Sequence, residues 1–157
     1  MEAPYAALAG VSVAESGYIG GTTLNPSYKD VCSGTTGHAE AVRVVFDPAR
    51  VSYASLLDVF FTVHDATQLN RQGNDHGTQY RSGIWYTSEA QRAEAAARIA
   101  KVPGAVTTLE AAAAHVWYPA EEYHQCYVAR NPTQGYVAAV SLPKLRKVRA
   151  AFPELLK

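Results

Sequence analysis

The sequence of 157 residues has no excess of charge of either sign, because its 14 lysines and arginines balance 14 aspartates and glutamates. Proteins that bind nucleic acids normally carry excess positive charge, which releases counterions from the phosphate backbone. The sequence also lacks an apolar run close to the ~20 residues of a membrane-spanning helix. No basic and apolar leader segment opens it. We therefore expect a cytoplasmic protein that binds neither nucleic acid nor membrane.

Cysteine is scarce as well, since Cys32 and Cys126 are the two in the sequence. Two cysteines do not make the disulfide framework of a small secreted domain, and in a reducing compartment we expect free thiols. The histidines show no ligand spacing such as His-x-x-x-His, and neither a GxGxxG nor a P-loop motif is present. We therefore expect no metal and no nucleotide cofactor.

Hydrophobic residues form 48% of the sequence and charged residues 18%, which is typical of a globular domain. No repeat or linker divides the chain, so we expect one domain over residues 1–157. Strand-like and helix-like patterns alternate and predict an α+β domain of two layers. The predicted strands are residues 11–18, 38–46, 84–86 and 106–111. The predicted helices are residues 1–8, the stretches after Ser52 and Ser88, residues 119–130, and the stretch around Leu145, Val148 and Phe152.

Helix starts are marked by two serines. Ser52 is a predicted N-cap, and apolar residues recur behind it at helical spacing: Leu56, Leu57, Phe60 and Phe61. Ser88 and Gln91 form a predicted capping box, and the helix that follows is expected to end before Pro103. Residues 1–8 differ, because no capping residue precedes that predicted helix.

Glu40 is the most informative single residue for chemistry. Strand alternation places it on the same face as Val42, Val44 and Phe46, which we predict to be the core face. A carboxylate at the edge of an apolar face is desolvated, which raises its pKa and makes it a candidate general acid. In the alternative interpretation, Glu40 lies just outside the strand and forms a salt bridge with a surface arginine.

Each of the two cysteines also allows more than one interpretation. Cys32 and His38 are close enough in sequence to form a thiol–imidazole pair, which can activate a nucleophile. A small buried thiol is the usual state of a free cysteine, and we favour that interpretation for Cys32. Cys126 falls within the predicted helix 119–130, where we also expect it to be buried in the core.

Two segments are dense in glycine and polar residues, at 28–40 and 70–80, and glycine lets the backbone approach a ligand closely. The run Tyr-Lys-Asp-Val-Cys-Ser-Gly-Thr-Thr-Gly-His-Ala-Glu begins at Tyr28. The run Gln-Gly-Asn-Asp-His-Gly-Thr-Gln-Tyr-Arg-Ser begins at Gln72. Both closely resemble the A-type peptide methionine sulfoxide reductases, and the resemblance extends over nearly the whole chain.

The resemblance implies a fold, a reaction and a set of site residues. The fold would be a two-layer ferredoxin-like sandwich, with helices packed on a mixed sheet. The reaction would reduce the S-epimer of methionine sulfoxide, as a cysteine in a Gly-Cys-Phe-Trp motif attacks the sulfoxide and becomes a sulfenic acid. By motif position, Glu40 would protonate the oxygen, while Tyr28, Tyr80 and Asp75 would arrange the site. Two phenols and a neutral carboxyl suit an oxygen that gains charge as its bond to sulfur breaks.

The sequence departs from the family because it contains no Gly-Cys-Phe-Trp. Residues 1–5 match the part of the family pattern that follows this motif. We therefore expect the nucleophile and the first strand of the family's sheet to be missing from these residues, and the chain to be inactive. Three interpretations remain open: a start further upstream, a selenocysteine as nucleophile, or an inactive remnant that binds methionine sulfoxide or nothing. A thiol enzyme that uses Cys32 and His38 is a weaker alternative.

The resemblance also implies partners. The substrate would be methionine sulfoxide in peptides or as the free amino acid. Val137 stands where many family members carry a resolving cysteine, so regeneration would depend on Cys32, Cys126 or an external thiol. Thioredoxin, glutaredoxin and glutathione are the candidate reductants, and we expect a monomer.

Overall fold

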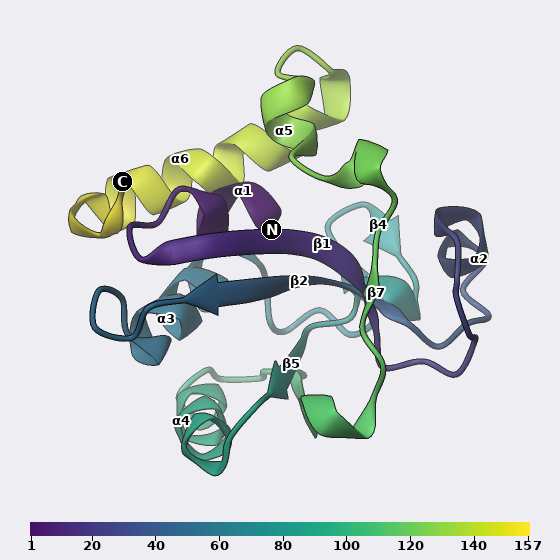
Figure 1. Ribbon diagram of the computed structural model, residues 1–157, viewed down its shortest axis with the longest axis horizontal. Coiled ribbons are helices and arrows are strands. Elements are labelled where there is room, and N and C mark those ends of the chain that lie inside the picture. Colours follow the sequence, from purple (N-terminus) through teal and green to yellow (C-terminus); the bar gives the residue numbers. More distant parts are fainter. The chain divides into compact units, whose positions relative to one another are not determined.

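The computed structural model describes residues 1–157 and is a mixed α/β structure (Figure 1). The chain forms two compact units. Unit 1 comprises residues 1–16, 42–64 and 120–157, and unit 2 comprises residues 17–41 and 65–119. Strands β1 (Val11–Ile19) and β2 (Ala39–Phe46) each continue from one unit into the other. They belong to a three-stranded sheet of order β2-β1-β7, in which β7 (Tyr118–Pro119) is antiparallel to β1.

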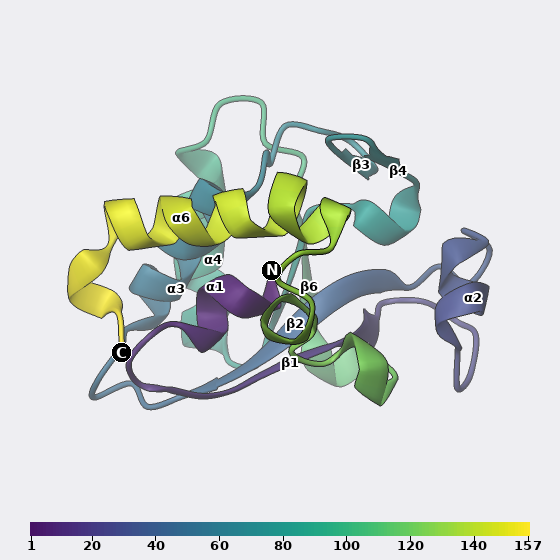
Figure 2. The same cartoon turned by 90° about the horizontal axis from the view of Figure 1, so that it is seen from above.

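Three helices build the core of unit 1. Helices α1 (Glu2–Ala6), α3 (Tyr53–Val63) and α6 (Leu142–Ala151) pack against one another (Figure 2). Eight apolar side chains are buried between them and the adjoining chain: Tyr5, Leu8, Val11, Val51, Leu56, Val59, Val63 and Val148. Full burial of one large apolar side chain contributes roughly 1.5–3 kcal/mol. This cluster is therefore the main source of stability in unit 1.

Several sequence-based predictions are confirmed in unit 1. Ser52 caps α3, as its hydroxyl accepts a hydrogen bond from the Ser55 N–H at 3.0 Å. Helix α1 begins without a side-chain cap, as the sequence indicated. The face of β2 that carries Val42, Val44 and Phe46 packs on the core, whereas Arg43 and Val45 on the opposite face are exposed.

Unit 2 contains a parallel strand pair linked by a helix. Strand β5 (Gly83–Tyr86) pairs with β6 (Thr108–Ala111), and α4 (Glu89–Ala100) packs on both. This is the crossover arrangement that parallel strands require. A short hairpin of β3 (Arg71–Gln72) and β4 (Asp75–His76) precedes a 3-10 turn, η1. Turn η1 spans Thr78–Tyr80 and helix α2 spans Tyr28–Cys32.

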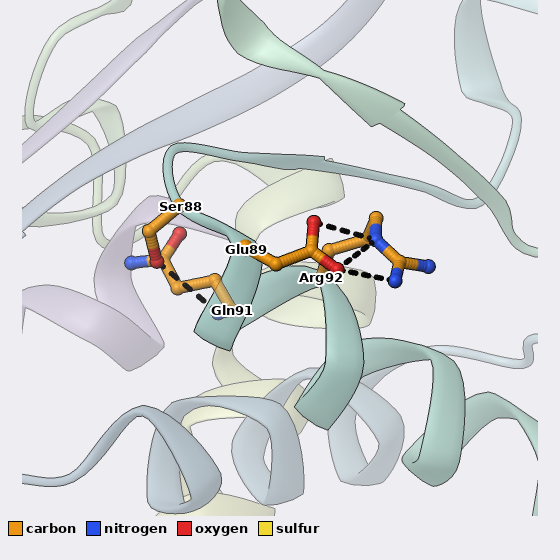
Figure 3. A network of polar contacts seen from close by, with 4 residues as sticks. All are labelled: Ser88, Glu89, Gln91 and Arg92. Atoms are coloured by element: carbon orange, nitrogen blue, oxygen red, sulfur yellow. Dashed lines mark hydrogen bonds and ion pairs between the residues drawn. The ribbon is translucent and has the colours of Figure 1, made fainter.

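The start of α4 agrees with the sequence only in part. The Ser88 hydroxyl accepts a hydrogen bond from the Gln91 N–H at 3.2 Å, so the predicted cap is confirmed (Figure 3). The Gln91 side chain does not complete the box at Ser88. It accepts a hydrogen bond from the Thr87 N–H at 2.8 Å, one residue earlier. An ion pair between Glu89 and Arg92 lies on the adjacent exposed face (Figure 3).

The predicted continuous helix over residues 119–130 is wrong. Strand β7 ends at Pro119, a single turn, η3, covers Glu122–His124, and α5 covers only Tyr127–Arg130. The break lies at Cys126, whose φ of +54° belongs to the left-handed region. A left-handed residue cannot continue a right-handed helix. The remaining short turns are η2 (Ala112–Ala114) and η5 (Pro153–Leu155), and a π-helical segment, η4 (Val137–Ser141), leads directly into α6.

Side-chain contacts within unit 1 explain this break. The Gln125 amide accepts a hydrogen bond from the Ser16 N–H at 2.9 Å and donates to the Ser16 carbonyl at 2.8 Å. The same amide donates to the Ala120 carbonyl at 3.1 Å. These hydrogen bonds connect residues 120–125 to β1. Tertiary contacts of this kind override a modest helix propensity. None of the helices combines the length and the hydrophobicity that spanning a lipid bilayer requires.

Candidate active site

Helix α2 presents Tyr28 at the start of a well-capped turn. The Ser27 hydroxyl accepts a hydrogen bond from the Asp30 N–H at 3.1 Å, and the Asp30 carboxylate accepts one from the Ser27 N–H at 2.9 Å. These reciprocal bonds form a capping box. The hydrogen bonds from Ser27 also lower the pKa of Asp30. The cap fixes where the helix begins, and therefore fixes the backbone from which the Tyr28 phenol projects.

Glu40 is the second residue of β2, so the interpretation that places it outside the strand is wrong. Burial by surrounding protein, followed by the negative charge of Asp75, raises the pKa of Glu40 to about 7. Water still reaches part of this side chain, which is exposed, so its desolvation is incomplete. A carboxyl with this pKa is protonated in about half of the molecules at neutral pH, as a general acid must be.

The phenols of Tyr28 and Tyr80 share the same surroundings. Burial, followed by the charges of Glu40, Asp75 and Cys32, raises the pKa of Tyr80 to about 12. A hydrogen bond with the Cys32 side chain, followed by burial, raises the pKa of Tyr28 above its usual value. Both phenols are therefore protonated hydrogen-bond donors at neutral pH. The structure thus brings all four predicted site residues into one cluster in unit 2, beside Cys32.

Asp75 reaches this cluster from the β3–β4 hairpin. It pairs with Gln72 across the hairpin, and Gly73 occupies the turn with a φ of +58°, a conformation that favours glycine. The half-buried Asp75 side chain acts on Glu40 and Tyr80 through its charge. A carboxylate near a second carboxyl favours the neutral form of its neighbour.

The alternative in which Cys32 and His38 form a catalytic thiol–imidazole pair is not supported by the geometry of His38. His38 is buried, its Nδ1 accepts a hydrogen bond from the Gly21 N–H at 3.0 Å, and its Nε2 lies 2.7 Å from the Thr23 carbonyl. This geometry fixes the tautomer with the proton on Nε2, which donates to Thr23. Both ring nitrogens are therefore engaged with the backbone, and His38 has no free nitrogen to activate Cys32.

Both cysteines are exposed, so the predictions that they are buried are wrong. Cys32 ends a five-residue helix at the protein surface, and its side chain lies beside Tyr28 rather than in the core. Cys126 occupies the left-handed break that precedes α5. In α2 it is the neighbouring Val31 that takes the buried position, and Cys32 faces outward.

Sequence reasoning missed Gln79. This residue is 5% exposed, and its Nε2 lies 3.5 Å from the carbonyl oxygen of Cys32. Its position between Gly77 and Tyr80, inside the matched polar segment, was the available signal.

The site is rich in proton donors but not in metal ligands. No group of three or more histidine, cysteine, aspartate or glutamate side chains could hold a metal ion. The chemistry that the cluster supports is proton donation.

Comparison with known proteins gives a consistent result. A family model described as peptide methionine sulfoxide reductase matches residues 1–155. The peptide methionine sulfoxide reductase MsrA of Pasteurella multocida is 48% identical over 160 residues, which cover 100% of this chain and 92% of the relative. The MsrA of Erwinia tasmaniensis is 54% identical over 158 residues, which cover 96% of this chain and 87% of the relative.

The crystal structure of reduced Mxr1 from Saccharomyces cerevisiae superposes with a TM-score of 0.74 at 36% identity. The superposition covers 80% of this chain and 74% of that structure. The sequence match and the structural match therefore agree over most of the molecule. The chain belongs to the peptide methionine sulfoxide reductase family.

Proposed function

We propose that this chain serves the reduction of the S-epimer of methionine sulfoxide to methionine, in peptides or as the free amino acid. The observation that carries the proposal is the Glu40 carboxyl, with a pKa of about 7, in one cluster with the Tyr28 and Tyr80 phenols. The names of the relatives, which are methionine sulfoxide reductases, support the same reaction.

In the proposed reaction, a thiol or selenol attacks the sulfoxide and takes over its oxygen atom. The S–O bond of the substrate breaks, methionine leaves, and the nucleophile becomes a sulfenic or selenenic acid. Glu40 is the general acid that protonates the departing oxygen, while Tyr28 and Tyr80 donate hydrogen bonds to it. Burial raises the pKa of Glu40, and the like charge of Asp75 raises it further.

The nucleophile is assigned to neither of the two thiols in residues 1–157. Cys32 lacks an imidazole base, because both nitrogens of His38 are engaged. The family's nucleophile belongs to a Gly-Cys-Phe-Trp segment, which these residues do not contain. A first thiol, from Cys32, Cys126 or an external donor such as thioredoxin, glutaredoxin or glutathione, would then condense with the oxidised nucleophile to a disulfide or selenosulfide and water. A second thiol would exchange with this bond and release the reduced nucleophile.

A second candidate function follows because residues 1–157 do not contain the Gly-Cys-Phe-Trp segment. A polypeptide of residues 1–157 alone would bind methionine sulfoxide, or nothing, without reducing it. We expect no reduction of a peptide methionine sulfoxide by this polypeptide with dithiothreitol. Turnover that disappears in Cys32→Ala would contradict this and would make Cys32 the nucleophile.

The decisive experiment joins Gly-Cys-Phe-Trp-Gly ahead of Met1 and offers the two epimers of a peptide methionine sulfoxide separately. We expect reduction of the S-epimer and none of the R-epimer. A matched chain with serine in place of the added cysteine is the control. Reduction of the R-epimer, or activity in the control, would contradict the proposal.

The proposal includes one catalytic domain over residues 1–157 with a two-layer ferredoxin-like arrangement. The TM-score of 0.74 with the yeast protein supports this arrangement. A cytoplasmic monomer remains part of the same proposal.

A further inference from the structure

Gln79 is a buried amide within the candidate site, and the proposed reaction gives it no role. Its Oε1 atom is shielded from solvent and has no hydrogen-bond partner. Its Nε2 atom makes one long contact, 3.5 Å to the Cys32 carbonyl oxygen. Buried polar groups are nearly always paired, and leaving one unpaired costs stability. A buried amide with so few bonds therefore calls for a functional explanation.

The position of this amide suggests what it does. The Cys32 carbonyl lies at the C-terminal end of α2, where a helix leaves carbonyl groups without intrahelical partners. Gln79 faces this carbonyl from the η1 turn and directly precedes Tyr80. The amide thus connects the helix that carries Tyr28 with the turn that carries Tyr80.

The Gln79 amide occupies the space beside Gly77, which has no side chain. A Cβ atom at Gly77 would lie 2.1 Å from the Gln79 Oε1, so a larger residue there would displace the amide. The φ of +137° at Gly77 also belongs to a conformation that only glycine adopts readily. Because Oε1 is shielded from solvent, a bound substrate does not reach it. Gln79 therefore acts on its protein neighbours and not on the substrate.

We propose that Gln79 is a positioning residue, which fixes the end of α2 against the η1 turn so that the Tyr28 and Tyr80 phenols keep their placement beside Glu40. This inference rests on the proposed function. The link to Tyr28 runs through Cys32, since the Cys32 backbone meets the Gln79 amide and its side chain hydrogen-bonds the phenol.

The first test needs no enzymatic activity. In a Cys126→Ser background, Cys32 is the remaining thiol of residues 1–157, and its rate of alkylation by iodoacetamide reports on the end of α2. We expect Gln79→Met to raise this rate about fivefold, the equivalent of one neutral hydrogen bond. Gln91→Met is the matched control, because it also removes a bonded amide, at the start of α4. An unchanged rate in Gln79→Met, or an equal rise in the control, would overturn the proposal.

The second test uses the chain with Gly-Cys-Phe-Trp-Gly joined ahead of Met1. We expect Gln79→Met to lower kcat about fivefold and to leave KM within about twofold, since Gln79 does not touch the substrate. A raised KM with unchanged kcat would overturn the proposal. If Gln79→Met does not fold, Gln79→Asn withdraws the amide by one methylene and is expected to give the same pattern. If this chain reduces nothing, the proposed function fails, while the alkylation test still decides the role of Gln79.

Discussion

The carboxylate of Glu2 accepts a hydrogen bond from the backbone N–H of Cys126 at 2.7 Å, across 124 positions of sequence. Its second oxygen accepts a hydrogen bond from the Ser16 hydroxyl at 2.6 Å. One side chain of α1 therefore binds both β1 and the left-handed residue that precedes α5. This relationship ties the left-handed residue between η3 and α5 to α1 and β1.

The Glu2 contact predicts a graded loss of stability. Glu2→Met removes both acceptors and leaves the Cys126 N–H without its partner. The cost is about 1.5–3 kcal/mol, the range for hydrogen bonds to charged groups. Glu2→Gln is expected to cost less, because its carbonyl can still accept from Cys126 while the Ser16 hydroxyl rotates to accept from its NH2. Thermal unfolding measures both, at about 2–4 °C per kcal/mol for a chain of this size.

Glu15→Met is the matched control for this series. Glu15 pairs with Arg43 at 3.2 Å, and the Arg43 side chain is 53% exposed. An exposed ion pair of this kind contributes only about 0–1 kcal/mol. Equal losses in Glu2→Met and Glu15→Met would show that the Glu2 contact has no special role.

The roles of the site residues predict an order of effects in the chain with Gly-Cys-Phe-Trp-Gly joined ahead of Met1. Glu40→Gln should keep substrate binding and lower the rate of reduction by about 10²–10⁴-fold, because an amide cannot supply the proton. Tyr28→Phe and Tyr80→Phe should each cost less, since one phenol can partly replace the other. Single-turnover kinetics measures this step directly. A Glu40→Gln rate within about twofold of the parent would exclude the general-acid role.

The pKa of Glu40 predicts how the rate depends on pH. Its carboxyl can donate a proton only while protonated, so the rate should fall as pH rises through about 7. Asp75→Asn removes the negative charge that raises this pKa. The falling limb should therefore move to lower pH in Asp75→Asn. A limb that stays in place, or moves to higher pH, would show that Asp75 does not act through its charge.

Local signals predicted those parts of the fold that depend on local interactions. The caps at Ser52 and Ser88 bond to N–H groups three residues away, and strand alternation within β2 identified the face that carries Glu40. The break at Cys126 depends on Glu2, which lies 124 positions away, so no local pattern could indicate it. The charged residues after Pro119 are typical of a first helical turn, and that local signal was overridden by the tertiary contact.

In the candidate site, too, local signals identified one residue, while the others depend on tertiary structure. Glu40 could be identified from its strand, whereas Tyr28, Tyr80 and Asp75 were found only through the family resemblance. Their proximity depends on how α2, η1 and the β3–β4 hairpin come together in three dimensions. Gln79 was missed because a glutamine in a polar, glycine-rich loop gives no sign of being buried.

Adding a side chain is expected to have opposite effects on stability at Gly21, which lies against the backbone before β2, and at Gly135. A Cβ atom at Gly21 would lie 2.3 Å from the backbone nitrogen of His38 and 2.4 Å from the carbonyl oxygen of Thr36. These are backbone atoms and cannot move aside as a flexible side chain would. Gly135 is helical, and a Cβ atom there would meet nothing within 4 Å.

We therefore expect Gly135→Ala to stabilise the chain by about 0.4–1 kcal/mol, because alanine fits the native backbone there and restricts the unfolded chain. Gly21→Ala should destabilise it by at least the ~1–3 kcal/mol typical of overpacking. The backbone at Gly21, just after β1, would have to move away from the segment before Glu40. Chemical denaturation of the two variants beside the parent chain measures both effects. The separation should also disturb the Gly21 hydrogen bond to His38, which the NMR chemical shift of the imidazole Nδ1 would detect. A Gly21→Ala variant as stable as the parent, with an unchanged His38 signal, would mean that this close backbone approach does not hold the start of β2.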